Sequence, residues 1–300
     1  MISLGVAELI ASSALILRTF FGGEAGISAN RTRLLKLFGW NFGPQIQIYY
    51  LVAAWTLIAV IAMYALTRTP LGRMCNAVRD NPERVQFVGY NPHVVRYLAF
   101  CFSGFFAGIA GALAAINFEI ANSAYLGAAQ SGTVLFATYI GGIGFFIGPI
   151  VGAIFVTFLS LGLSDLTQVW QLYFGVIFIA VVAFAPGGIT GLLMMHRPLV
   201  KAGTLTRMLP SYLIALVPTL AMIAGFILSL ETIVHYTVNP GDDSHIKAFG
   251  VAFDAASPYI WAMAAILLIG GYLVARKTWS WVGHAWSDAT SGAREKGIPA

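Results

Sequence analysis

Long apolar stretches recur along most of this 300-residue chain, and they limit the folds open to it more than any other feature. A helix needs about 20 mainly apolar residues to cross the roughly 30 Å of hydrocarbon in a bilayer. About eight stretches meet this requirement, and we expect transmembrane helices at 3–21, 46–66, 97–117, 129–146, 148–164, 169–186, 209–230 and 258–275. The sequence therefore predicts an all-α, polytopic membrane protein embedded in a lipid bilayer.

The composition agrees with this class. Charged residues make up only 10% of the chain, whereas they make up about 25% of a typical protein. The basic residues are not interleaved with aromatic residues in any soluble segment, so we expect no nucleic-acid partner. Cys75 and Cys101 are too far apart in sequence for a paired metal motif, and we predict neither a metal site nor a cofactor. No phosphate-binding glycine loop and no paired nucleophile and base occur, so the chain is not expected to be an enzyme.

The basic residues also predict an orientation. Most of the 17 lysines and arginines lie in three segments, 67–96, 194–207 and the tail from Arg276 onward. Cytoplasmic loops carry such an excess, so these segments are predicted to face the cytoplasm. The loop 22–45 violates the rule because it also contains basic residues and is predicted to face outward. The orientation rests on 67–96, which carries the stronger signal.

The segment 67–96 has the local signals of two short helices. Gly72–Arg79 contains no helix breaker, and Asn81 followed by Pro82 is a typical cap and first position of a second helix. Gly89 can end that helix, and Asn91-Pro92 repeats the start signal for the next span. A loop that serves only the positive-inside rule needs no helix caps or stops. The predicted helix pair therefore favours the hypothesis that this segment is a docking site for a partner. The alternative is that its charges serve only topology.

Two groups of small residues lie within the predicted spans. They recur at helical spacing in SGFFAGIAGALAA (103–115), which is mainly a packing signal for close helix contacts. A second cluster, Gly141, Gly142, Gly144, Gly148 and Pro149, predicts a tight turn or a broken helix that lines a pathway. The pair of stretches around this cluster is therefore either two spans or one broken helix.

Three motifs then carry a resemblance to a known family. They are GRMCNAVRDNPERVQFVGYNPHVVRYLAFCFSGFFAGIAGALAA, GGIGFFIGPIVGA and VVAFAPGGITGLL, in this order along the chain. The chain resembles the permease subunits of branched-chain amino acid ABC importers, the LivM/LivH family. ISLGVAELI and GGEAGIS near the start are also similar to family segments, so the resemblance covers roughly residues 2–193.

The resemblance implies a type II-like ABC importer permease fold, present in part. Residues 1–193 would form the permease domain, and 194–300 an extension with a transmembrane hairpin (209–275) and a cytoplasmic tail. The implied function is a multi-pass permease subunit in the bacterial plasma membrane that imports branched-chain or related amino acids. The implied partners are ABC ATPase subunits, a second permease subunit as heterodimer partner, and a periplasmic substrate-binding protein.

The resemblance also assigns residues. The loop that would contact the ATPase contains Gly72, Arg73, Arg79, Asp80, Asn81, Glu83, Arg84 and Gly89. A short helix pair with charges of both signs can dock through complementary polar contacts and transmit a rigid-body movement. The sequence also departs from the family pattern: the stretch 83–89 is bulkier, and the family's N-terminal GYxGQxSLGHAAF-type segment with its spans is absent.

Few ionisable groups lie within the predicted spans. Glu8 is the one well inside a span, and it either lines the pathway or pairs with a neighbouring helix. Thr133 stands where many family members carry an acidic residue. We therefore predict Glu8, Thr133, Gly141, Gly142 and Gly144 as possible pathway-lining residues.

Two other functions remain open from the sequence. An ion-coupled secondary transporter would need ionisable residues at the middle of the membrane and internal repeats. Glu8 gives little support for it, and no repeat is visible. A membrane scaffold without transport activity is disfavoured by the glycine-rich break at 141–149.

Overall fold

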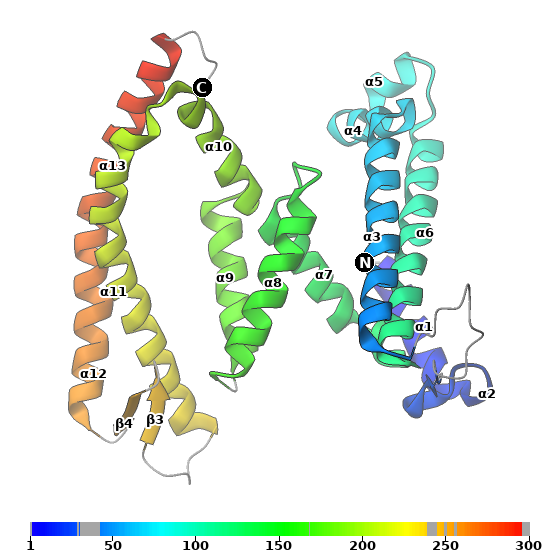
Figure 1. Ribbon diagram of the computed structural model, residues 1–300, viewed down its shortest axis with the longest axis horizontal. Helices are drawn as coiled ribbons and strands as arrows, with labels where there is room; N and C mark the ends of the chain where they lie inside the picture. Colours follow the sequence, from blue (N-terminus) through cyan, green and yellow to red (C-terminus); the bar gives the residue numbers. More distant parts are fainter. Residues whose placement is uncertain are drawn as a thin grey trace. The chain divides into compact units, whose positions relative to one another are not determined.

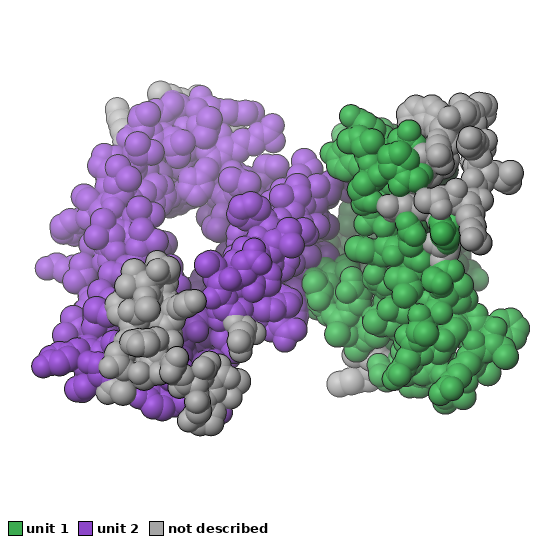
Figure 2. Space-filling model, turned by 60° about the horizontal axis from the view of Figure 1, so that its bottom comes forward, with its two compact units in different colours: residues 1–135 green, residues 136–300 purple. Residues whose placement is uncertain are grey.

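The computed structural model describes residues 2–28, 30, 43–167, 169–238, 245–248, 251–254 and 257–295. These residues are overwhelmingly helical, which confirms the predicted all-α class, and two small antiparallel strand pairs accompany the helices (Figure 1). The chain divides into two compact units, Met1–Leu135 and Phe136–Ala300, coloured separately in Figure 2. The division falls within one helix, α7 (Ala128–Gly141).

The first unit is organised around a pair of long helices, α3 (Gln45–Arg68) and α6 (Pro92–Phe118), which pack together. Two short helices, α4 (Pro70–Asp80) and α5 (Pro82–Phe87), connect them and lie at one end of the pair (Figure 1). The remaining elements are α1 (Ile2–Ile16), α2 (Arg18–Phe21), η1 (Gly23–Ala25), β1 (Ile27–Ser28), β2 (Ile120–Ala121) and η3 (Ser123–Leu126). β1 pairs with β2 antiparallel, with Ile27 opposite Ala121, so the GGEAGIS segment joins the end of α6 that lies away from α4 and α5.

The second unit contains the rest of α7, three further helices and a long hairpin. The three helices are α8 (Gly148–Ser164), α9 (Trp170–Phe184) and α10 (Gly188–Ala202). The hairpin consists of α11 (Leu205–Val238), β3 (His245–Ala248), β4 (Val251–Asp254), α12 (Pro258–Ala265), the π-helical turn η4 (Ile266–Gly270) and α13 (Gly271–Glu295).

Close backbone contacts at two glycines hold the hairpin together. Gly225 of α11 lies against the backbone of Leu268, and Gly271 of α13 lies against the backbone of Met222. A Cβ at either glycine would approach backbone atoms closer than side chains do, so both positions need glycine. Met208 and Ala289 are buried together toward the far end of α13, which explains why the helix continues through the polar stretch after Arg276. The predicted spans 209–230 and 258–275 therefore lie within longer helices.

The number of clear spans is smaller than expected. Among the described residues, four helices are long and apolar enough to cross a membrane: Gln45–Arg68, Pro92–Phe118, Met208–Thr237 and Pro258–Gly292. Two bent pairs raise the number to six at most, with an 88° bend after Ile16 and a 42° bend between α9 and α10. The predicted spans 129–146 and 148–164 are not among these candidates, because α7 and α8 have only 14 and 17 residues.

The predicted break at the glycine cluster is present as a turn between α7 and α8. Gly141 lies against the carbonyl group of Gly148, and Gly152 of α8 lies against the carbonyl oxygen of Ala137. Gly142 has a φ of +109° and lies against the backbone of Gly187 in the turn before α10. Backbone therefore meets backbone at these positions, and there is no room for a side chain.

We expect Gly152→Ala to destabilise the protein by about 1–3 kcal/mol, because the new methyl group overlaps the carbonyl oxygen of Ala137. Gly162→Ala on the same helix is the matched control, since a Cβ there meets no atom within 4 Å. Thermal unfolding of the two purified variants in detergent measures the difference. Equal melting temperatures would contradict the packing described here.

Candidate functional site

The segment between α3 and α6, which we call the α4–α5 segment (residues 69–91), contains all eight residues that the sequence assigned to a docking loop. It begins with a helix cap, Thr69, that was not among the residues predicted from the sequence. Thr69 is extended, with φ −74° and ψ 162°, and its Oγ1 accepts a hydrogen bond from the Gly72 N–H at 3.3 Å. Pro70 occupies the first turn of α4. Thr69-Pro70 is thus the same cap-and-proline signal as Asn81-Pro82.

The corner between α4 and α5 has the geometry predicted from Asn81-Pro82. Asn81 is extended, with φ −156° and ψ 101°, and its Oδ1 accepts a hydrogen bond from the Arg84 N–H at 3.1 Å. α4 ends before this residue and α5 starts after it, so the two helices are separate. Arg79 Nε donates to Asp80 Oδ1 at 3.2 Å, and both side chains are exposed, so this ion pair contributes little to stability.

The end of α5 also follows the prediction. Gly89 has a φ of +87°, and the N–H of Tyr90 donates to the carbonyl oxygen of Val85 at 3.1 Å. Asn91 Oδ1 then accepts from the His93 N–H at 2.9 Å, and α6 begins at Pro92. The segment consists of two capped helices that end at a glycine, so it is a folded element and not an irregular loop.

Glycine is needed at position 89 for its backbone conformation and not for lack of space, because a Cβ there would meet no atom within 4 Å. We expect Gly89→Val to cost about 1–2 kcal/mol, since L-residues are strained at positive φ. Asn tolerates this region, so Gly89→Asn is the matched control with a smaller loss. Limited proteolysis at residues 85–92 should be faster in the valine variant alone. Equal cleavage of both variants would show that the left-handed stop is not needed.

A small apolar core fixes the α4–α5 segment to α6, and a close backbone contact joins it to α3. Val78 of α4, Val85 of α5 and Val95 of α6 are buried together, with Leu71 and Met74 packed against them. At the start of α4, a Cβ on Gly72 would come within 2.7 Å of the Thr67 Cα. The first turn of α4 therefore lies directly on the last turn of α3. A displacement of the segment must move α3 and α6 with it, because packed interiors have few voids and transmit strain.

The outer surface of the segment is polar with an apolar end. Five charged residues are exposed: Arg73, Arg79, Asp80, Glu83 and Arg84. Phe87 and Val88, at the end of α5, are 90% and 70% exposed. A shallow cavity of about 250 Å³ lies beside them, lined by Met74, Ala77, Asp80, Asn81, Arg84, Val85 and Val88.

Exposed apolar residues rimmed by charges mark interaction surfaces. The bulk of 83–89 is visible in the sequence, but the exposure of Phe87 is not.

The residues predicted to line a pathway are not gathered in one place. Glu8 is exposed on α1, and Thr133 is exposed on α7, where its Oγ1 donates to the Ala129 carbonyl at 3.1 Å. Gly141 and Gly142 are buried at the helix contacts described above, and Gly144 is exposed in the turn. Their role in a pathway stays a prediction. Among the described residues, no group of three His, Cys, Asp or Glu side chains could hold a metal ion.

Comparison with known proteins gives matches to transport permeases. Residues 1–186 match the family model described as "Branched-chain amino acid transport system / permease component". The chain is 28% identical over 189 residues to the high-affinity branched-chain amino acid transport system permease protein LivM of Escherichia coli, covering 61% of this chain and 44% of LivM. It is 27% identical over 141 residues to the ribose import permease protein RbsC of Haemophilus influenzae, covering 45% of this chain and 42% of RbsC.

A third relative is the fructose import permease protein FrcC of Rhizobium meliloti, 30% identical over 146 residues, with 46% of this chain and 39% of FrcC covered. The chain thus spans less than half the length of each of these relatives. No solved structure matches the chain.

Proposed function

Because the chain belongs to the family of permease components of branched-chain amino acid transport systems, we propose that it is a membrane-spanning permease subunit of an ATP-driven importer. The observation that carries the proposal is the α4–α5 segment. It is folded by two caps and a glycine stop, packed onto α6 through three buried valines and onto α3 at Gly72, and it exposes charged side chains around Phe87. These properties suit a docking site that passes movement to the membrane helices.

The proposed partner at this segment is the ATPase subunit of the importer. Family membership implies ABC transporter partners, and the exposed charges of both signs favour a protein surface with complementary charges. The apolar end formed by Phe87 and Val88 would enter a pocket of that surface, since exposed aromatic anchors of this kind provide much of the binding energy in protein interfaces. A second permease subunit, a periplasmic binding protein and a bacterial plasma membrane location complete the proposal.

The proposed substrates are branched-chain or related amino acids. The support is the family description and the identity to LivM. RbsC and FrcC are import permeases for ribose and fructose, so the relatives of this chain import solutes of more than one type. The family assignment favours this function over the ion-coupled transporter and the scaffold that the sequence left open.

The proposal is tested by reconstituting the chain with its ATPase and binding-protein partners in liposomes, with and without a second permease subunit. We expect leucine with the binding protein to stimulate ATP hydrolysis only when the chain is present. ATP hydrolysis measured without the second permease subunit shows whether this chain works as a homodimer. Failure of any ATPase to associate with the chain would overturn the proposal.

A further inference from the structure

The hairpin of α11, α12 and α13 lies outside the residues that match the family model, and aromatic side chains gather near both of its ends. At one end, Tyr236 of α11 stacks on Trp261 of α12 with ring centroids 6.3 Å apart. Toward the other end, Trp279 and Trp281 of α13 are 56% and 53% exposed. Tyrosine and tryptophan are enriched at the two interfaces between a bilayer and water. The two aromatic groups therefore mark two candidate interfaces.

The spacing of these groups fits one bilayer. Trp261 and Trp281 belong to one continuous helical stretch, Pro258–Gly292. They are 20 residues apart in sequence, which corresponds to about 30 Å at a rise of about 1.5 Å per residue. The hydrocarbon core of a bilayer has this thickness. The stretch between the two tryptophans therefore spans the hydrocarbon, and α13 leaves it near Trp281.

Beyond these tryptophans, α13 lies among polar groups of the same unit. Nδ1 of His196 in α10 lies 2.7 Å from the carbonyl oxygen of Leu192, and Nε2 lies 2.8 Å from the hydroxyl oxygen of Tyr212 in α11. The His196 ring also meets Trp286 of α13 edge to face, with centroids 5.2 Å apart. A histidine with both ring nitrogens in polar contacts is typical of a region outside the hydrocarbon. The end of α13 is thus placed at the membrane surface and beyond it.

Two positive charges lie at this boundary. Arg276 and Lys277 are exposed on α13, one turn before the tryptophans. A helical side chain lies over the turn that precedes its own Cα, so the indole rings of Trp279 and Trp281 lie at the depth of these two cations. Ala275, on the buried face of α13, is 5% exposed. The cations therefore point away from the protein, with an aromatic ring on either side.

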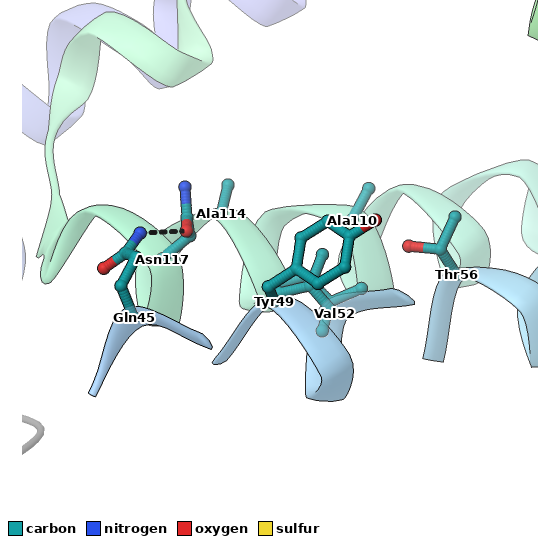
Figure 3. Close-up of a pocket in the computed structure, with 8 residues that line it drawn as sticks. Gln45, Tyr49, Val52, Thr56, Ala110, Ala114 and Asn117 are labelled. Atoms are coloured by element: carbon teal, nitrogen blue, oxygen red, sulfur yellow. Dashed lines mark hydrogen bonds between the residues drawn. The ribbon is translucent and has the colours of Figure 1, made fainter. Parts of the chain in front are cut away.

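The protein supplies no counter-charge for this pair. Within the described part of the chain, neither Arg276 nor Lys277 pairs with a carboxylate. Neither α10 nor the part of α11 before Glu231 contains an acidic residue. Polar side chains elsewhere do have protein partners: in a groove between α3 and α6, Gln45 Nε2 donates to Asn117 Oδ1 at 3.4 Å (Figure 3). Because unpaired charge at membrane depth is costly, the counter-charge of the two cations comes from a molecule outside this chain.

The face around the cations changes from apolar to open along α13. Ile269 and Leu273, which precede Arg276 and Lys277 at helical spacing, are 57% and 59% exposed. On the other side of the cations, a Cβ at Gly283 would meet no atom within 4 Å, so this part of the face has free space. The face thus offers an apolar surface, two positive charges and open space in that order. An acyl chain, a phosphate and a head group follow one another in the same order in a phospholipid.

We infer that this face of α13 binds an anionic phospholipid, with the phosphate between Arg276 and Lys277 and an acyl chain along Ile269 and Leu273. A guanidinium group can donate two parallel hydrogen bonds to phosphate oxygens. The two positive charges favour a lipid with net negative charge, because basic residues at a membrane surface gain energy from anionic lipids. A zwitterionic lipid brings its own ammonium group and gains less. This site is separate from the docking of the ATPase and from the transported solute, so it goes beyond the proposed function.

The test uses the purified full-length chain in detergent after removal of bound lipid. Short-chain phosphatidylglycerol or phosphatidylcholine is added, and native mass spectrometry measures the Kd of each. The variant Arg276→Gln with Lys277→Gln removes the site. Arg197→Gln with Lys201→Gln is the matched control, because it removes the same charge from two exposed residues of α10 in the same unit. The exchange of Arg276→Lys with Lys277→Arg keeps both charges at the site.

We expect the unmodified chain to bind phosphatidylglycerol more tightly than phosphatidylcholine. The double glutamine variant of α13 should bind phosphatidylglycerol about thirtyfold more weakly, which corresponds to the loss of two basic contacts with an anionic lipid surface. Its affinity for phosphatidylcholine and its melting temperature should change little, because both side chains are exposed. The α10 control and the exchange variant should keep the affinity of the unmodified chain.

Three outcomes would overturn the inference. Equal Kd values for the two lipids would show that the face contacts hydrocarbon or another subunit and does not recognise lipid charge. An equal loss of affinity in the α10 control would show that only the net charge of the chain matters. Displacement of phosphatidylglycerol by an equal concentration of inorganic phosphate would show a site for free anions and not for lipid.

Discussion

Phe87→Asp is expected to weaken association of the ATPase with this chain strongly while leaving insertion into the membrane intact. Phe87 is 90% exposed at the end of α5, so the substitution removes no contact from the buried valine core. It replaces a large apolar surface with a carboxylate that must lose its water when the partner binds. Truncation of a buried aromatic anchor typically costs about 2 kcal/mol or more, which is at least about a thirtyfold loss of affinity. Co-purification of the ATPase and its affinity for the membrane complex measure the effect.

Two controls separate docking from general damage. Gln86→Asp places the same charge one residue earlier, on an exposed side chain that points in another direction along the helix, and it should retain most of the binding. Phe87→Leu keeps an apolar anchor and should restore a large part of it. If Phe87→Asp retains ATPase binding equal to the unmodified chain, the apolar end of the α4–α5 segment is not part of the interface.

The sequence predicted the α4–α5 segment well because its signals are local. A cap such as Asn81 acts on an N–H three residues later, and the glycine at 89 meets a requirement of its own backbone. These requirements are visible in a few consecutive residues. The exposure of Phe87 was not predictable in the same way, since it depends on which helix face packs against α6.

The membrane spans were predicted less well, because their ends and bends depend on more than local sequence signals. Hydropathy over 3–21 is continuous, yet the helix stops after Ile16 and turns sharply, because Leu17 adopts a non-helical conformation with φ −79° and ψ 65°. The polar stretch after Arg276 remains helical because it packs on α11, where Ala289 and Met208 are buried together. The glycine cluster predicted a turn, but the contact of Gly142 with the turn before α10 joins positions far apart in sequence. Contacts of this kind are tertiary, and a single sequence does not reveal them.

Gly72→Val is expected to uncouple ATP hydrolysis from transport while the ATPase still binds. Gly72 lies in the first turn of α4, and a Cβ there would meet the Leu66 carbonyl oxygen at 2.5 Å and the Thr67 Cα at 2.7 Å. All of these are backbone atoms at the end of α3, so no side chain can rotate away. The first turn of α4 must move, which disturbs the Thr69 cap on the Gly72 N–H and costs about 1–3 kcal/mol.

Because Phe87 belongs to α5 and the new side chain meets only backbone at the end of α3, the apolar anchor should survive this change, while the rigid contact that passes movement from α4 to α3 is lost. ATP hydrolysis should then persist with leucine uptake reduced about tenfold or more, since small misplacements of a positioned element have effects of this size. Gly89→Asn serves as the comparison, because it changes a glycine of the same segment where a Cβ meets open space, and it should keep hydrolysis and uptake linked. Uptake per ATP hydrolysed in the reconstituted complex measures the coupling. An unchanged ratio in Gly72→Val would show that the contact between α4 and α3 does not transmit the movement.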